Sequence, residues 1–401
     1  MDRTNFFVTA ALALVAAAGC KQSGGGNTGG AGGATSAAST SSATGTGTGG
    51  ATTASSGTGG TTSASSGTGG SPTCSPGGPP AWSATCPMDS MHNGTPCSPW
   101  GDICMAGQCL CEAPGKCKQV VALACGQDNP VAVAVDATHV YWINDAASGA
   151  VMKIPLAGGV PVALAAAQDH PSGLAVDATH VYWTSSGDGA VRRVLLGGGT
   201  PDTLVASQDQ PSGLAVDATS VYFTTATAVL KAPLAGGAPT VLAPNQSGPV
   251  SLAVDAASVY WVTPDGAVKK APIGGGPTVM IALGQPVPHG LALDATSVYW
   301  SNLGMSGIPN GPGGSVMKAP LAGGVAVMLS SGPAGPIVGS GIAVDASGVY
   351  WAAGQVLEVP LAGGSVAMLT GYQHDPYAIT VDATHVYWVD SMAGSVSALA
   401  K

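Results

Sequence analysis

Residues 176–183 read Val-Asp-Ala-Thr-His-Val-Tyr-Trp, and close copies of this stretch recur along the C-terminal two-thirds of the 401-residue chain. Its aspartate returns at Asp136, Asp177, Asp217, Asp255, Asp294, Asp345 and Asp382. The copies follow one another at about 40 residues, except for the longer step of 51 residues from Asp294 to Asp345. A period of this size, with four short strands in each copy, is typical of β-propeller blades. We therefore predict an all-β protein with a seven-bladed β-propeller over residues 119–401.

One repeat shows how four strands arise. Residues 173–177 alternate as a first strand of small side chains, and Asp177 can bond backbone amides of the turn that follows. Residues 181–184 carry the β-branched and aromatic side chains that favour a second strand. Third and fourth strands are predicted over residues 190–196 and 202–206, with glycine-rich turns between them.

The last repeat ends at Lys401 after its third strand, which leaves one blade a strand short. Residues 120–130, ahead of the first repeat, align with residues 161–171, which hold a fourth strand and the loop after it. We predict that this N-terminal strand completes blade seven and closes the ring, because closure removes exposed sheet edges. An open solenoid is the alternative, and the complementary half-blades at the two ends argue against it.

Each second strand carries a pair of aromatic residues. The pairs are Tyr141-Trp142, Tyr182-Trp183, Tyr222-Phe223, Tyr260-Trp261, Tyr299-Trp300, Tyr350-Trp351 and Tyr387-Trp388. With the preceding Val-Asp and a following Pro-Leu-Ala-Gly-Gly, they resemble the YWTD and NHL group of propellers over residues 119–401. This resemblance implies a propeller that binds a protein or a small ligand on a face or in its funnel. The family's fourth-position aspartate is present only at Asp390.

The N-terminus has the pattern of an export signal. The apolar run from Phe6 to Ala18 is too short to span a bilayer as a helix. It leads into Ala17-Ala18-Gly19-Cys20, which resembles the lipobox of bacterial lipoproteins and implies lipidation of Cys20. The following Lys21 favours the outer membrane. We predict a signal peptide over residues 1–20 and an outer-membrane lipoprotein of the cell envelope; an ordinary secretory signal cut near Gly19 is the alternative.

Two further segments precede the propeller. Residues 21–73 are almost entirely Gly, Ser, Thr and Ala, and predict a disordered linker. Residues 74–118 form a small cysteine-rich module, and the clustered cysteines are Cys74, Cys86, Cys97, Cys104, Cys109, Cys111, Cys117 and Cys125. An even number of cysteines in an exported segment predicts disulfides. Zinc is the alternative, because Cys104 and Cys109 approach the spacing of a ligand pair.

Composition and motifs argue against several classes of function. Charged residues make up 8% of the chain and the net charge is −9, so no basic face for nucleic acid is expected. No Gly-x-Ser-x-Gly elbow, His-Glu-x-x-His or EF-hand loop is present. We expect a monomer with no catalytic residues, no cofactor and no metal, attached to the membrane by its lipid anchor alone.

Blade geometry divides the loops between two rims. The first-to-second and third-to-fourth turns lie on one rim, here the Asp rim, with the repeated aspartates. We expect these aspartates to cap turns and to form weak surface ion pairs with a basic column of third strands. That column is Lys153, Arg193, Lys231, Lys270 and Lys318, with Glu358 interrupting it. We interpret the Tyr-Trp pairs as core between blades.

The opposite rim, here the Gln rim, varies more between repeats, and such loops usually carry binding. Six of its seven fourth-to-first loops hold a Gln before a Pro, which either lines a polar funnel mouth or caps loop backbone. The candidate ligand-binding residues are Asp128, Asp169, His170, Asp209, His289, His374 and Asp375. We predict a membrane-tethered module that binds an unknown protein or small ligand at the cell envelope. The alternatives are a structural envelope protein, and a lyase or hydrolase, because seven-bladed streptogramin lyases resemble this repeat and use a His, an acid and a divalent ion.

Overall fold

The computed structural model describes residues 109–111, 117–304, 314–331, 341–371, 373 and 375–401. The signal peptide with Cys20, the linker, most of the cysteine module (Cys74, Cys86, Cys97 and Cys104 included), most of the insertion after Gly304, and His374 lie outside the described residues. The predictions made for them stay predictions. Within the described part of the chain, no helix is long and apolar enough to cross a membrane.

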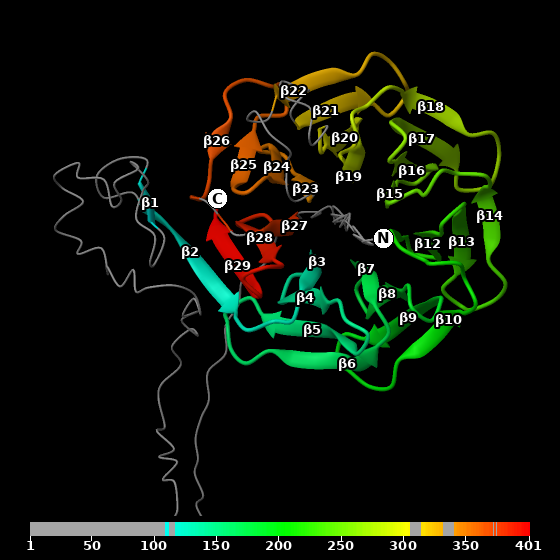
Figure 1. Cartoon of the computed structure of the whole chain (residues 1–401), viewed down its shortest axis with the longest axis horizontal. Coiled ribbons are helices and arrows are strands. Elements are labelled where there is room, and N and C mark those ends of the chain that lie inside the picture. The colour runs from blue at the N-terminus through cyan, green and yellow to red at the C-terminus, as the bar shows by residue number, and fades with distance from the viewer. Residues whose placement is uncertain (1–108, 112–116, 305–313, 332–340, 372, 374) are drawn as a thin grey trace, which may run out of the picture. The chain divides into compact units, whose positions relative to one another are not determined.

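Seven antiparallel sheets stand around a common axis as the blades of a ring (Figure 1). Blade 1 holds β3 (Pro130–Val135), β4 (His139–Asn144), β5 (Gly149–Pro155) and β6 (Val162–Gln168). Blade 2 holds β7 (Pro171–Val176), β8 (His180–Ser185), β9 (Ala190–Leu195) and β10 (Asp202–Val205). Blade 3 holds β11 (Leu214–Val216), β12 (Ser220–Thr224), β13 (Val229–Pro233) and β14 (Thr240–Ala243).

The next three blades follow the same order, from the strand nearest the axis outward. Blade 4 holds β15 (Ser251–Val254), β16 (Ser258–Thr263), β17 (Ala267–Pro272) and β18 (Val279–Ala282). Blade 5 holds β19 (Pro288–Leu293), β20 (Ser297–Asn302), β21 (Ser315–Pro320) and β22 (Val327–Ser331). Blade 6 holds β23 (Ile342–Val344), β24 (Val349–Ala352), β25 (Val356–Val359) and β26 (Ala367–Met368). The prediction of seven four-stranded blades is confirmed.

Blade 7 is built from both ends of the propeller sequence. β27 (Pro376–Val381), β28 (His385–Asp390) and β29 (Ser395–Ala400) come from the C-terminus, and β2 (Cys117–Ala124) supplies the fourth strand. Val120 faces Leu399 and Val121 faces Ala398 in antiparallel register, which confirms the predicted closing strand. The short β1 (Cys109–Cys111) adds a fifth strand outside β2, which was not predicted.

Cys125 directly follows the closing strand and is disulfide-bonded. The pairing of the remaining cysteines stays a prediction, because their side chains lie outside the described part of the chain.

The paired aromatic side chains form the core between blades. Tyr222 of blade 3 packs in one cluster with Trp261 of blade 4, and Tyr260 of blade 4 in the next cluster with Trp300 of blade 5. Neighbouring residues of a strand point to opposite faces, so each pair contacts both adjacent blades. Fully burying one large apolar side chain stabilises a fold by roughly 1.5–3 kcal/mol, and this contact is repeated around the ring.

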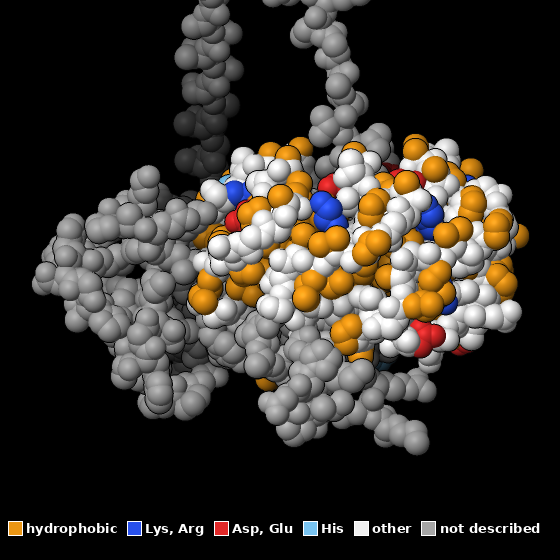
Figure 2. Space-filling view, turned by 90° about the horizontal axis from the view of Figure 1, so that it is seen from above, with side chains coloured by type: hydrophobic (Ala, Val, Ile, Leu, Met, Phe, Trp, Pro, Cys, Tyr) orange, Lys and Arg blue, Asp and Glu red, His pale blue; other side chains and the backbone are white. Residues whose placement is uncertain are grey.

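Close approach near the axis explains the small residues of the first strands. A Cβ on Gly173 would lie 2.2 Å from the carbonyl oxygen of Ser212 in the next blade, so no side chain fits there. The outer wall is different: hydrophobic side chains are scattered over it with few charged groups between them (Figure 2). Val279, Met280, Val327 and Met328 of the outermost strands are among those exposed.

We predict that deleting residues 119–125 strongly lowers the melting temperature of the propeller. The deletion removes most of β2 and leaves β29 without its outer partner, so the ring loses the pairing that joins its two ends. Circular dichroism or calorimetry of the full chain and the deletion variant measures this. An unchanged melting curve would contradict the closing role of β2.

Candidate functional site

The repeated aspartates of the Asp rim are structural. Asp177 Oδ1 accepts hydrogen bonds from the backbone amides of Thr179 (2.7 Å) and His180 (2.8 Å), and its Oδ2 accepts one from the Tyr182 hydroxyl (2.7 Å). Burial by itself raises the pKa of Asp177, but these donors outweigh it and hold the pKa below its usual value. The same contacts recur at Asp136, Asp217, Asp294 and Asp382. The expected turn capping is confirmed.

We predicted ion pairs between the repeated aspartates and the basic column. For the five cations of that column the prediction is wrong. The five cations instead donate to backbone carbonyls of the next blade: Lys153 to Leu196, Arg193 to Leu234, Lys231 to Ile273, Lys270 to Leu321 and Lys318 to Leu361. The physical reason is that the aspartate oxygens are already occupied by amides and a tyrosine hydroxyl. Among the described residues, the one aspartate of the column paired with a cation is Asp345, whose partner is Lys401.

The glutamines of the Gln rim cap the loops rather than line a funnel mouth. Gln168 Oε1 accepts a hydrogen bond from Trp183 Nε1 at 3.0 Å, and its Nε2 donates to the carbonyl oxygen of Ala166 at 2.8 Å. Gln127, Gln246 and Gln285 make the same two contacts in their blades. In blades 1, 2, 4 and 5 the glutamine therefore satisfies the indole that the second strand buries, and in these blades it caps its loop.

We predict that Gln168→Leu lowers the free energy of unfolding by about 1 kcal/mol more than Gln208→Leu does. Both glutamines donate to the carbonyl two residues before them, but Gln208 belongs to the blade with Phe223, which has no indole N–H to leave buried without an acceptor. Urea unfolding of the two variants measures the difference. Equal losses would show that the indole contact contributes nothing.

Apart from His289, the remaining described candidates lie in loops directly before first strands. Asp128 and Asp209 are exposed, and Asp169 is half-buried. The residue before the proline of each loop turns sharply: φ is 48° at Asn129, 47° at His170 and 49° at Gln210. This left-handed conformation is rare outside glycine, so the loops hold a specific shape that carries the aspartates to the rim.

Asp145, in the loop between β4 and β5 of blade 1, was not singled out by the sequence analysis. Its Oδ1 lies 3.0 Å from His170 Nδ1, in the loop before blade 2, and the Asp128 side chain of the loop before blade 1 is also close to it. Burial raises the pKa of Asp145 and the hydrogen bond with His170 lowers it; the nearby charge of Asp128 adds a smaller increase, and the net shift is upward. Blade geometry places second-to-third loops on the Gln rim. An acidic residue in such a loop could therefore have been recognised as a candidate from the sequence.

The aspartates gather over one part of the ring. Asp375 precedes blade 7, and its Oδ2 accepts a hydrogen bond from Ser391 Oγ at 2.6 Å. Asp128 precedes blade 1, Asp169 blade 2 and Asp209 blade 3, while the corresponding loops before blades 4 and 5 carry no acid. We call Asp128, Asp145, Asp169, Asp209 and Asp375 the acidic sector; it spans four consecutive blades.

His289 lies apart from this set. It belongs to β19 of blade 5, and 3% of it is exposed, so it is a buried residue of the inner wall rather than a loop ligand at the surface. Burial lowers its pKa from 6.5 to about 3. Among the described residues, no group of three or more His, Cys, Asp or Glu side chains could hold a metal ion.

We predict that acid destabilises the protein through His289. The unfolded chain takes up a proton on this imidazole near pH 6.5, whereas the native state does so only near pH 3, so stability falls as the pH drops between these values. From pH 7 to pH 5 the loss is roughly 2 kcal/mol. Urea midpoints at the two pH values should therefore move further for the wild type than for His289→Gln. Equal movement would contradict the assignment.

Comparisons with solved structures agree with the seven-bladed ring. Selenomethionine-substituted virginiamycin B lyase from Staphylococcus aureus matches with a TM-score of 0.59 and 12% identity, over 71% of this chain and 99% of that chain. The WD40 β-propeller domain of Doa1 matches with a TM-score of 0.56 and 11% identity, over 70% of this chain and 96% of that chain. At such identities the likeness shows the fold alone.

A nidogen/laminin complex is more similar in sequence but less so in structure. It matches with 22% identity and a TM-score of 0.45, over 55% of this chain and 88% of that chain, and we base no argument on it. No model of a known protein family matches the sequence, and no curated protein matches it significantly. The fold and the comparisons together define the class as a seven-bladed β-propeller; membership of the YWTD or NHL group stays a prediction.

Proposed function

We propose that this protein is an exported, membrane-tethered binding module whose acidic sector holds a basic surface of a partner protein, and that it has no catalytic role. The observation that carries the proposal is the unequal use of carboxylates on the two rims. On the Asp rim the repeated aspartates are taken up by turns and tyrosines. On the Gln rim, Asp128 and Asp209 project from loops whose capping is done by the neighbouring glutamines.

Charge density supports a cationic partner. The acidic sector places five aspartates on four consecutive blades, and its one histidine contact is His170 with Asp145. Like charges gathered on one face raise the local concentration of oppositely charged groups and speed association. The loops before blades 1 and 3 are capped by their own glutamines, and such preorganised loops lose little conformational entropy when a partner docks.

The tether belongs to the same proposal. A lipidated Cys20 followed by a Gly/Ser/Thr/Ala linker would hold the propeller at the outer membrane and leave its rims accessible. A small ligand in place of a protein remains an outcome of the test below, and so does a purely structural envelope role.

We predict that the triple variant Asp128→Asn/Asp169→Asn/Asp209→Asn loses its envelope partner at least tenfold. The substitutions keep side-chain size and remove three charges of the acidic sector. Affinity capture by the full chain from envelope material, followed by quantitative mass spectrometry, measures retention. The control is Asp202→Asn, which removes an exposed carboxylate beside the third-to-fourth turn of the Asp rim.

The proposal expects one protein that the wild type and the control retain, that the triple variant loses, and that added salt releases. Equal retention by all three chains would refute the acidic sector as the binding face. Absence of any specifically retained protein would favour the structural role or the small ligand over the proposed partner.

A further inference from the structure

The basic column builds the same contact at successive blade junctions. In blade 3, Lys231 lies directly across from Tyr222 in the strand register, and its Nζ stands 5.5 Å from the centroid of that ring. The same Nζ donates to the carbonyl oxygen of Ile273 in blade 4 at 3.3 Å. We call this arrangement the cation bridge: a third-strand cation facing the tyrosine of its own blade and bonded to a turn carbonyl of the next blade.

Blades 1 to 5 each supply the cation of their own bridge. The facing pairs are Tyr141 with Lys153, Tyr182 with Arg193, Tyr222 with Lys231, Tyr260 with Lys270 and Tyr299 with Lys318. An amine near a tyrosine face is stabilised by the ring, and the carbonyl satisfies one of its donors. The position therefore selects a cation on a flexible apolar stem.

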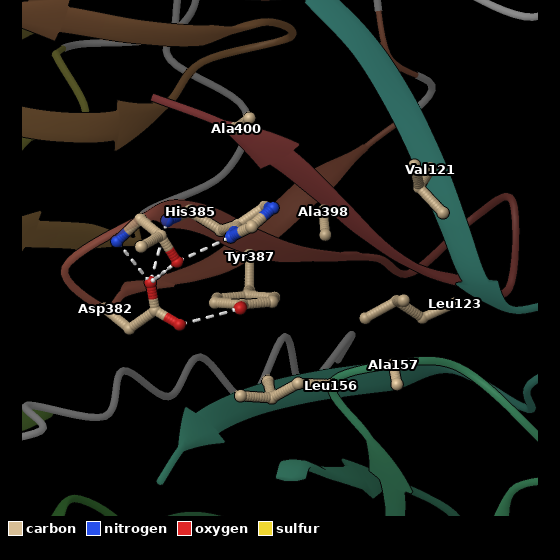
Figure 3. Close-up of a pocket in the computed structure, with 10 residues that line it drawn as sticks. Val121, Leu123, Leu156, Ala157, Asp382, His385, Tyr387, Ala398 and Ala400 are labelled. Carbon is tan, nitrogen blue, oxygen red and sulfur yellow. Dashed lines mark hydrogen bonds between the residues drawn. The ribbon is translucent and has the colours of Figure 1, made fainter. Parts of the chain in front are cut away.

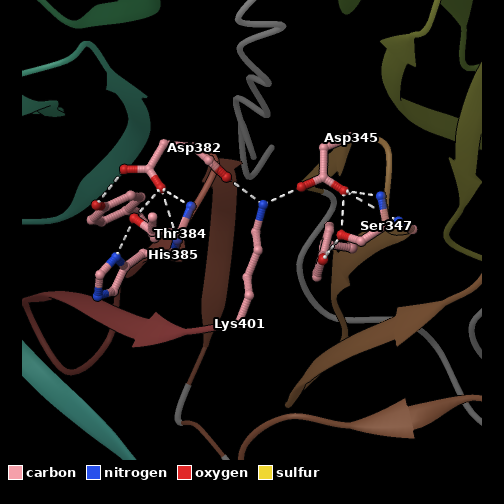
Figure 4. A network of polar contacts seen from close by, with 9 residues as sticks. Asp345, Ser347, Asp382, Thr384, His385 and Lys401 are labelled. Carbon is pink, nitrogen blue, oxygen red and sulfur yellow. Dashed lines mark hydrogen bonds and ion pairs between the residues drawn. The ribbon is translucent and has the colours of Figure 1, made fainter.

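Blade 6 lacks this cation, and another part of the chain replaces it. Glu358 faces Tyr350 in the register. Lys401, at the end of blade 7, turns back and places its Nζ 5.1 Å from the centroid of the Tyr350 ring. It also donates to the Asp345 carboxylate and to the carbonyl oxygen of Asp382, as Figure 4 shows. The cation between blades 6 and 7 is thus supplied by blade 7 instead of blade 6.

At the junction of blades 7 and 1, the register position of the cation is occupied by a methyl group. Ala398 faces Tyr387, and the turn of the next blade is represented by Leu156. A pocket of about 590 Å³ opens at this point between the two blades (Figure 3). Its lining residues are Val121, Leu123, Leu156, Ala157, Asp382, Thr384, His385, Tyr387, Ala398 and Ala400.

The tyrosine of the cation bridge is present at this pocket as Tyr387, and Leu156 of the next blade also lines it. Asp382 Oδ2 accepts the hydroxyl of Tyr387 at 2.8 Å, as in the blades that hold a cation. Burial raises the pKa of Asp382, but hydrogen bonds, chiefly from the Thr384 amide and the Tyr387 hydroxyl, lower it below its usual value, so the carboxylate stays ionised. Burial, with the adjacent Asp382, raises the pKa of Tyr387, so its ring stays neutral.

The walls of the pocket suit the stem of such a cation. Val121 and Leu123 of the closing strand supply apolar surface beside Ala398. Methylene groups of a lysine side chain pack against surface of this kind while the ammonium group keeps polar partners. The split blade and the missing cation coincide at the same junction.

We propose that this pocket between blades 7 and 1 binds an alkylammonium group supplied from outside the chain, either the lysine side chain of a partner or a small primary amine. The inference goes beyond the acidic sector, because the pocket lies on the Asp rim and uses other residues. A bound ammonium joins blade 7 to blade 1 as Lys231 joins blade 3 to blade 4.

The first test titrates the full chain with n-butylammonium chloride and follows the methyl resonance of Ala398 by NMR. We expect a saturable shift with the amine and none with 1-butanol, which has a similar stem and no charge. An equal response to both compounds, or no response to the amine, overturns the proposal. Nα-acetyl-lysine amide then separates the sources: binding at least as tight as that of n-butylammonium identifies a partner side chain, and weaker binding a small amine.

The second test fills the pocket from within. Ala398→Lys places the chain's own cation across from Tyr387, so we expect a higher melting temperature and at least a tenfold weaker response to n-butylammonium, read from the melting temperature. Ala398→Met fills the same space without a charge; it should also weaken the response, but stabilise less. A full amine response in both variants overturns the proposal.

A variant that creates a second, equivalent site provides the matched control. Lys231→Ala creates at blades 3 and 4 the arrangement that Ala398 has at blades 7 and 1. This variant should melt below the wild type, and n-butylammonium should raise its melting temperature more than that of the wild type. If the amine restores nothing, the bridge does not select an ammonium group, and the proposal fails. This result is independent of partner capture by the acidic sector.

Discussion

The fold depends on the buried tyrosine of each second strand. Its ring packs with the aromatic residue of the next blade, as Tyr222 does with Trp261. In most blades its hydroxyl ties the aspartate turn of its own blade, as Tyr222 does with Asp217. A single four-stranded sheet cannot bury its faces alone, so blades are stable only when stacked. One residue type therefore links turn, blade and ring.

Because the contact runs from each blade to the next, the ring has to close for all of them to be satisfied. β2 supplies the strand that blade 7 lacks, and hydrogen bonding between β2 and β29 joins segments from the two ends of the propeller. Closure makes blade 7 less regular than the other blades. Blade 7 ends at Lys401, whose side chain serves blade 6, and Ala398 leaves the next bridge without a cation. The pocket described above lies at this irregular junction.

The same separation between repeated and variable positions decides where a partner is expected. Residues that recur from blade to blade are used by the fold: the aspartates bind the turns, and in four blades a glutamine binds the indole of the second strand. Residues that change from blade to blade, such as Asp128 and Asp209, remain exposed. The binding that we propose uses residues that do not stabilise the fold. Propellers of one fold can differ in function at such positions.

The sequence by itself determined the blade number, the strand order, the closing strand and the aromatic core. Those features follow from periodic patterns and local hydrogen bonding, which a chain displays along its length. It did not determine the acceptors of the basic column, because Lys231 bonds to Ile273, which lies in a different blade. It also missed Asp145, whose contact with His170 crosses from blade 1 to blade 2.

The importance of Ala398 can be recognised only in the tertiary structure. An alanine in a strand predicts nothing, but across from Tyr387 and beside Leu156 it leaves open a space that a cation fills at five equivalent junctions. Packing between blades decides this, because the value of a side chain there depends on atoms brought together only when the ring closes.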